Sequence, residues 1–196
     1  MINKENKVVK IHDLIHGIPI FESALLEQTP PLLELRLVNC KILPLECKLI
    51  PLLHSVHALR ILDLSCNSVR LLGLLLLLTP KDKEAFKALR DLILVHCGIS
   101  DHHLEKIPLG LLQKPKAKFT LEALNISYNS IGSLARMLTE DLMGPTLKKL
   151  QMVQCKLGND FAKAFCAKIP SLKALQQIDI SYNIGLTDFS LIHSCL

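Results

Sequence analysis

Apolar residues recur at one fixed spacing along most of the chain. The clearest stretch is Leu121, Leu124, Ile126, Asn129 and Ile131, with polar or small residues between them. Alternation over Leu124 and Ile126 predicts a short strand with one buried side, and the asparagine predicts a side chain that hydrogen-bonds the following turn. The same frame recurs at Leu32, Leu35, Leu37, Cys40, Ile42; at Leu59, Leu62, Leu64, Asn67, Val69; at Leu89, Leu92, Leu94, Cys97, Ile99; at Leu147, Leu150, Met152, Cys155, Leu157; and, with a one-residue slip, at Leu175, Ile178, Ile180, Asn183, Leu186.

The frame fits the leucine-rich repeat template L-x-x-L-x-L-x-x-N/C-x-L. Successive copies begin at residues 32, 59, 89, 121, 147 and 175, at intervals of 27, 30, 32, 26 and 28 residues. Intervals of this length leave room for a helix on the outer side of each repeat. The sequence therefore predicts an α/β leucine-rich repeat solenoid of about six repeats, with a parallel sheet on the concave side and helices on the convex side.

Cysteine and asparagine alternate at one position through the six copies. The turn position reads Cys40, Asn67, Cys97, Asn129, Cys155 and Asn183, and we expect these six side chains to form a structural turn ladder. Valine precedes each cysteine by two places, and serine precedes each asparagine in the same way. This pattern, over residues 32–186, resembles the ribonuclease-inhibitor-like class of leucine-rich repeats, whose fold is a horseshoe.

The repeats also suggest the domain organisation. Residues 1–31 contain no complete repeat and are interpreted as an N-terminal segment or a degenerate capping repeat. Residues 32–196 form the predicted repeat domain. Solenoid ends need a covering repeat, and none is evident before Leu196. We therefore expect a truncated C-terminus and a fragment of a longer protein; the alternative is an end surface reserved for a partner.

Composition narrows the function classes. Hydrophobic residues make up 49% of the 196 residues and aromatic residues only 4%, which predicts an aliphatic core and argues against base stacking on an aromatic platform. The net charge of +5 is modest, and the cluster of Lys114, Lys116 and Lys118 is interpreted as a solvated loop.

The leucine run at residues 71–78 is far shorter than the roughly 20 residues that span a bilayer. No membrane contact is expected.

The seven cysteines include no CxxC pair. We expect them to be reduced, as in the cytosol or nucleus.

Residues between the template leucines should face the concave side of the sheet, since side chains alternate along a strand. We predict partner binding by this face and by a rim just past it, through the face residues Arg36, Asp63, Ile93, Asn125, Gln151 and Asp179 and the rim residues His96, Tyr128 and Tyr182. Two simpler interpretations stay open. Arg36 can pair with Asp63 on the next strand, and Ser-Tyr-Asn can be an ordinary variant of the turn.

Signatures of catalysis and metal binding are absent from the sequence. The pairs His54 with His57 and His102 with His103 lack the spacing and partners of zinc sites. No G-x-S-x-G motif or phosphate-binding glycine loop occurs. We therefore expect a protein that is not an enzyme and needs no cofactor.

Two stretches resemble the C-terminal repeat region of the Tonsoku-like DNA repair proteins. They read Leu134-Ala135-Arg136-Met137-Leu138 with Gly144-Pro145-Thr146-Leu147-Lys148-Lys149-Leu150, and Ile169-Pro170-Ser171-Leu172 with Ile178-Asp179-Ile180-Ser181-Tyr182-Asn183-Ile184-Gly185-Leu186. The resemblance implies a nuclear scaffold in recombination repair at replication forks, with chromatin or recombination proteins as partners. The histone-reading ankyrin domain of that family has no counterpart here.

Other functions fit the repeats as well. The chain can be a cytosolic leucine-rich repeat inhibitor or the sensing region of an innate immune receptor, although its concave face is neither acidic nor rich in aromatic residues. Direct nucleic-acid binding through Lys114, Lys116 and Lys118 and through the N-terminal lysines is a third interpretation, and it predicts affinity that falls as salt rises.

Overall fold

The structure is a computed structural model, and it describes residues 2–3, 8–12, 31–41, 53–79, 85–100, 120–132, 139–140, 142–188 and 193. The predicted lysine loop at residues 114–118 lies outside these ranges. Within them, no helix combines the length and the apolar character that crossing a bilayer requires.

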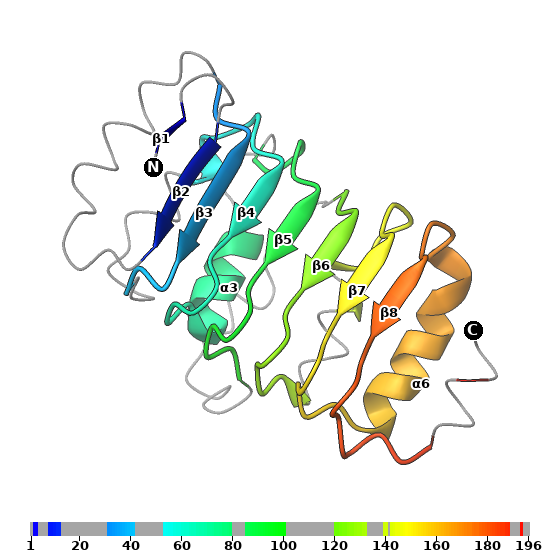
Figure 1. The fold of residues 1–196 in the computed structure, drawn as a ribbon. Helices are drawn as coiled ribbons and strands as arrows, with labels where there is room; N and C mark the ends of the chain where they lie inside the picture. Colours follow the sequence, from blue (N-terminus) through cyan, green and yellow to red (C-terminus); the bar gives the residue numbers. More distant parts are fainter. Residues whose placement is uncertain are drawn as a thin grey trace.

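The described strands form one sheet in which spatial order follows chain order. β1 and β2 are antiparallel, and every later neighbour pair is parallel. The strands are β1 (Ile2–Asn3), β2 (Val8–His12), β3 (Glu34–Val38), β4 (Ile61–Asp63), β5 (Asp91–Ile93), β6 (Ala123–Asn125), β7 (Lys149–Gln151) and β8 (Gln177–Asp179). Figure 1 shows them side by side in an open sheet. The predicted solenoid with parallel strands is confirmed.

The register of the sheet follows the repeat frame. The central leucines Leu35, Leu62, Leu92, Leu124 and Leu150 stand opposite one another on successive strands. All five are 0–1% exposed, so each repeat adds one leucine layer to a continuous core. β2 adds a strand before the first complete repeat. The domain boundary between residues 31 and 32 stays a prediction.

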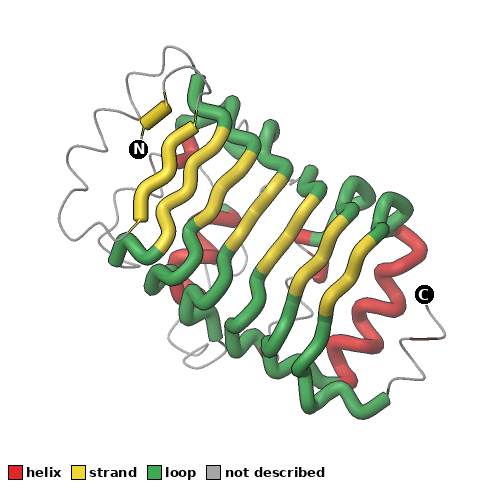
Figure 2. Tube along the Cα trace, viewed as in Figure 1, coloured by secondary structure: helices red, strands yellow, loops and turns green. Residues whose placement is uncertain are grey.

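Helices cover the buried face of the sheet in the described ranges. The helices are α3 (Arg70–Leu78) and α6 (Asn159–Lys168), and a 3-10 turn, η3 (Ile169–Ser171), follows α6. Figure 2 shows them on one side of the strands, and among the described residues the other side carries no helix. We call that other side the open face.

The two helices bury apolar side chains for different sequence reasons. α3 is apolar almost all round, as expected of a helix enclosed by other elements, and Leu74, Leu75 and Leu78 are fully buried. α6 is amphipathic, and Phe161 and Phe165, four residues apart on one face, stack with ring centroids 5.4 Å apart.

The cysteines do not all match the expectation of reduced thiols. Cys40, Cys66, Cys97 and Cys155 are free. Cys166, on α6, is disulfide-bonded, so the expectation is wrong at that position.

Candidate functional site

The turn after each strand is held by the ladder side chains. At Asn129, Oδ1 accepts the backbone N–H groups of Cys97 and Ile99 at 3.0 and 3.1 Å. Its Nδ2 donates to the carbonyl of Leu94 at 2.7 Å and to that of Ile126 at 2.8 Å. One buried amide thereby joins the turn of its own repeat to the turn of the preceding repeat.

The other ladder positions repeat this bridging. Asn67 and Asn183 make the same kinds of contact to the repeats before them. In the cysteine repeats the thiols act as donors: Cys97 donates to the carbonyl of Leu64 and Cys155 to that of Ile126, each at 3.2 Å. Burial raises the pKa of Cys97 to about 12 and that of Cys155 to about 11, so both thiols keep their protons.

A second alternating motif supports the ladder, in addition to the features predicted from the sequence. An aspartate or asparagine stands two residues before each serine, at Asp63–Ser65, Asn125–Ser127 and Asp179–Ser181. In each case Oδ1 accepts the serine N–H at 3.0 to 3.1 Å. The hydroxyls of the first two serines then accept the N–H groups of Val95 and Val153 in the following repeats. The signal was the Asp/Asn-x-Ser spacing, confined to the asparagine repeats.

On the open face, predicted partner-binding residues contact one another. Arg36 donates to Glu34 at 2.6 Å and to Asp63 at 3.4 Å, as the simpler interpretation of Arg36 expected. The hydrogen bond with Glu34 raises the pKa of Arg36. Asn125 donates to Gln151 at 3.2 Å.

The remaining face residues are accessible to different degrees. Ile93 is partly exposed in the centre of the face. Asp179 accepts the Ser181 hydroxyl at 2.7 Å, and hydrogen bonds from Ser181 lower the pKa of Asp179. The face is therefore an ordered surface whose polar groups are largely paired with each other.

One exposed residue per repeat comes directly before the ladder residue, and we call these six residues the rim row. Its members are Asn39, Cys66, His96, Tyr128, Gln154 and Tyr182. All have a left-handed backbone, with φ between 52 and 60°. The backbone N–H groups of the first five donate to a carbonyl of the next repeat. The backbone of the row is thus fixed by the sheet, while its side chains remain at the surface.

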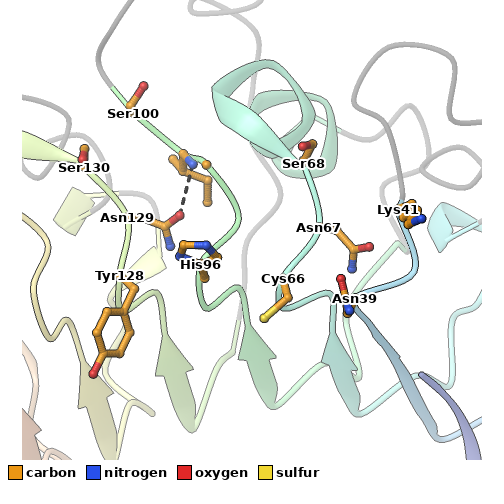
Figure 3. Close-up of a pocket in the computed structure, with 12 residues that line it drawn as sticks. Asn39, Lys41, Cys66, Asn67, Ser68, His96, Ser100, Tyr128, Asn129 and Ser130 are labelled. Carbon is orange, nitrogen blue, oxygen red and sulfur yellow. Dashed lines mark hydrogen bonds between the residues drawn. The ribbon is translucent and has the colours of Figure 1, made fainter. Parts of the chain in front are cut away.

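Four members of the rim row, Asn39, Cys66, His96 and Tyr128, border a hollow of about 760 Å³ across the ends of β3 to β6. Figure 3 shows Lys41 towards one end and Tyr128 towards the other, with Cys66 and His96 between them. Hydroxyl side chains also line it, at Ser68, Ser100 and Ser130. Among the twelve described residues around this rim hollow, Lys41 alone carries a formal charge when histidine is neutral.

The hollow combines predicted and unrecognised residues. It brings together the predicted rim residues His96 and Tyr128, whereas Tyr182 belongs to a later repeat and does not line it. Lys41, Cys66 and the three serines were not predicted. They could have been found from one shared feature of the sequence. Each lies within three residues of the ladder residue of its repeat, where the chain leaves the sheet.

Metal chemistry gains no support from the described residues, which contain no group of three or more histidine, cysteine or acidic side chains suited to a metal ion. The partner-binding roles of the named face and rim residues stay predictions.

Comparisons with known proteins agree with the repeat architecture. The family model described as Leucine Rich repeat matches residues 117–135, which include β6. The chain is also similar to a protein of Schizosaccharomyces pombe named adenylate cyclase, with 28% identity over 149 residues. The match covers 74% of this chain, and the chain spans only about 7% of that relative's length. The parallel strands, the shared leucine register and the matched repeat together identify the fold as a leucine-rich repeat solenoid.

Proposed function

We propose that the chain is a non-enzymatic scaffold that binds a protein partner through the open face and the rim row. The observation that carries the proposal is the rim row itself, which presents one exposed side chain per repeat at a backbone position set by the sheet. The leucine-rich repeat architecture, which forms extended binding surfaces, supports the same conclusion.

The rigidity of the surface favours binding. The ladder asparagines and the parallel strand pairs order the turns before any partner arrives. A preordered surface loses less conformational entropy on association than a flexible one. Tyr128 and Tyr182, 50% and 80% exposed, offer large amphipathic side chains of the kind enriched among residues that dominate interface energies.

At a finer level, we propose that the scaffold is a ribonuclease-inhibitor-like repeat protein acting in the nucleus in replication-coupled recombination repair. The support is the resemblance to Tonsoku-like proteins in the stretches that include Gly144-Pro145 and Ser181-Tyr182-Asn183. The disulfide at Cys166 argues against a nuclear location, because disulfides persist mainly in oxidising compartments. Proximity labelling with the full chain tests this level. Enrichment of replication or recombination proteins is expected, and their absence from the labelled set contradicts it.

The name of the fission-yeast relative does not suggest an activity for this chain. The chain spans only about 7% of that protein's length, so the match does not extend that protein's activity to this chain. We do not propose cyclase activity.

The scaffold proposal is tested by mapping a partner onto the two faces of the solenoid. A displayed library of folded protein domains is selected for binding to the full chain, and the affinities of the selected domains are measured. The double substitution Ile93→Glu and Gln151→Lys should weaken binding at least tenfold, because it places charges in the centre of the open face.

Lys163→Glu is the control substitution on the helical side, where the lysine side chain is 71% exposed. It should leave the affinity unchanged. Selected domains that lose affinity only with Lys163→Glu contradict the proposal.

A further inference from the structure

The rim hollow is rich in side-chain hydrogen-bond donors that have no partner among the described residues. Within the described part of the chain, the side chains of Lys41, Tyr128, Ser68, Ser100 and Ser130 make no hydrogen bond or ion pair. None of the twelve described residues that line the hollow carries a carboxylate, so the ammonium group of Lys41 meets no acidic side chain among them. A ligand that brings a carboxylate and backbone carbonyls would complement this set of donors.

The polar groups at the base of the hollow already have hydrogen-bond partners, in contrast to the donor side chains around it. Asn67 and Asn129 line it, and their amides are fully engaged with the carbonyls and N–H groups of the turns. A ligand therefore meets a rigid base and contacts the exposed side chains around it. This arrangement favours a ligand that lies along the rim across several repeats rather than one that penetrates the core.

The repeat spacing sets the length of such a ligand. Lys41 follows β3 and Tyr128 follows β6, so three strand intervals separate their repeats. Neighbouring strands lie about 4.8 Å apart, which gives a span of roughly 14 Å. An extended peptide advances about 3.3 Å per residue, so four residues cover roughly 13 Å, and residues four apart point to the same side.

We propose that the rim hollow binds an extended acidic peptide segment of the partner protein, with a carboxylate at Lys41 and, four residues away, an apolar side chain against the ring of Tyr128. This assignment rests on the proposed scaffold function and names the partner chemistry for one part of its surface. The serine hydroxyls donate to the backbone carbonyls of the peptide between these two anchors.

Synthetic peptides test the proposal directly. The probe is a fluorescently labelled, terminally blocked peptide Glu-Ser-Ala-Ser-Leu, prepared in both chain orders, and fluorescence polarisation reports its binding to the full chain. Replacing its glutamate by glutamine should weaken binding about fivefold, the limit for an exposed ion pair. Shortening the spacing to Glu-Ala-Leu should abolish measurable binding, because the two anchors can no longer be reached together.

The chain supplies matched controls for both anchors. Lys41→Gln should weaken binding about fivefold and remove the difference between the glutamate and glutamine peptides. Lys156→Gln should have no effect, although Lys156 is also exposed, follows a ladder cysteine and has a left-handed backbone, with φ of 56° against 53° at Lys41. Tyr128→Ala should weaken binding about tenfold, and Tyr182→Ala should not.

The outcomes separate this inference from the scaffold proposal. Equal binding of the glutamate and glutamine peptides, equal effects of the two lysine variants, or no peptide binding at all overturns the acidic-peptide site. If the folded domains selected on the full chain still depend on Ile93 and Gln151, the scaffold function stands while the rim site fails. If neither measurement maps to the open face or the rim, both proposals fail.

Discussion

Two rows of residues, adjacent in the sequence, behave in opposite ways. The ladder side chains at Asn67, Asn129 and Asn183 are 2–6% exposed and bond the turns of two repeats together. The residue directly before each of them, in the rim row, is exposed. Tyr128 and Asn129 show the contrast most clearly, because one peptide bond separates a surface phenol from a buried amide with five hydrogen bonds.

The contrast shows how a repeat protein separates stability from recognition. Ladder residues consume their hydrogen-bonding capacity inside the fold, so few residue types can replace them. Cys66, His96 and Tyr128 bond the next repeat through their backbone N–H groups, and their exposed side chains differ in chemistry from repeat to repeat. Substitutions in the two rows should therefore have separable effects.

The largest expected effect is that of Asn129→Ala. It leaves buried N–H groups of Cys97 and Ile99 and buried carbonyls without partners, and each orphaned group costs about 1–3 kcal/mol. We expect the free energy of unfolding to fall by about 3–5 kcal/mol in urea titrations. The control is Tyr128→Ala at the neighbouring rim position, which should cost less than about 0.5 kcal/mol. Equal losses at the two positions contradict the contrast.

Gly185→Ala should have the next largest effect, and it tests how closely the last described turns pack. A Cβ at Gly185 would lie 2.7 Å from the carbonyl oxygen of Leu157, so the backbone of one repeat must move. Overpacking of this kind costs about 1–3 kcal/mol. A Cβ at Gly158, across the same isolated bridge, would meet its nearest neighbour at 3.8 Å, so Gly158→Ala serves as the control with a smaller loss. Thermal melting of both variants provides the comparison.

The ladder thiols should make the fold sensitive to alkali. The folded-state pKa values of Cys97 and Cys155 are raised from 9.0 to about 12 and about 11. Between pH 9 and these values the unfolded chain binds fewer protons than the folded chain, so stability falls as pH rises. Between pH 9 and 10 the loss should be roughly 1 kcal/mol per thiol. Urea midpoints of the Cys97→Ala, Cys155→Ala double variant should show a correspondingly smaller decline, and an unchanged slope would reject a role for these thiols.

The smallest expected effect is at Gln154, which has φ of 52° and an exposed side chain outside the rim hollow. Gln154→Gly relieves the left-handed strain of roughly 1 kcal/mol, offset by the greater flexibility of glycine in the unfolded chain. We expect a net change within about 0.5 kcal/mol by thermal denaturation. A loss above about 1.5 kcal/mol would show that the rim side chain supports the fold after all.

The sequence carried most of the information about the fold. The spacing of Leu89, Leu92 and Leu94 reports which side of a strand is buried, because side chains alternate along a strand whatever lies around it. The same frame in successive repeats requires parallel neighbours with leucines in register, as the sheet has them. A helix was predictable at α3 from its dense apolar residues and at α6 from the helical spacing of Phe161 and Phe165.

The candidate site was less predictable, for two physical reasons. A polar residue on a strand suggests a partner contact, yet Asp63 is 7% exposed and bonds Arg36 and the Ser65 backbone. The rim hollow depends on left-handed backbone angles that bring Lys41, Ser68 and Ser100 from different repeats to one edge. Those backbone angles cannot be predicted from residue spacing or residue type alone.

Alkylation of the native thiols tests the central contrast most directly. The folded chain is treated with iodoacetamide at pH 8, and mass spectrometry of proteolytic fragments measures the modification of each cysteine over time. Cys66, exposed in the rim hollow, should be modified within minutes, whereas Cys97 and Cys155, fully buried in the ladder with raised pKa values, should remain unmodified for hours. Modification of Cys97 and Cys155 as fast as that of Cys66 would contradict the division between a closed ladder and an open rim.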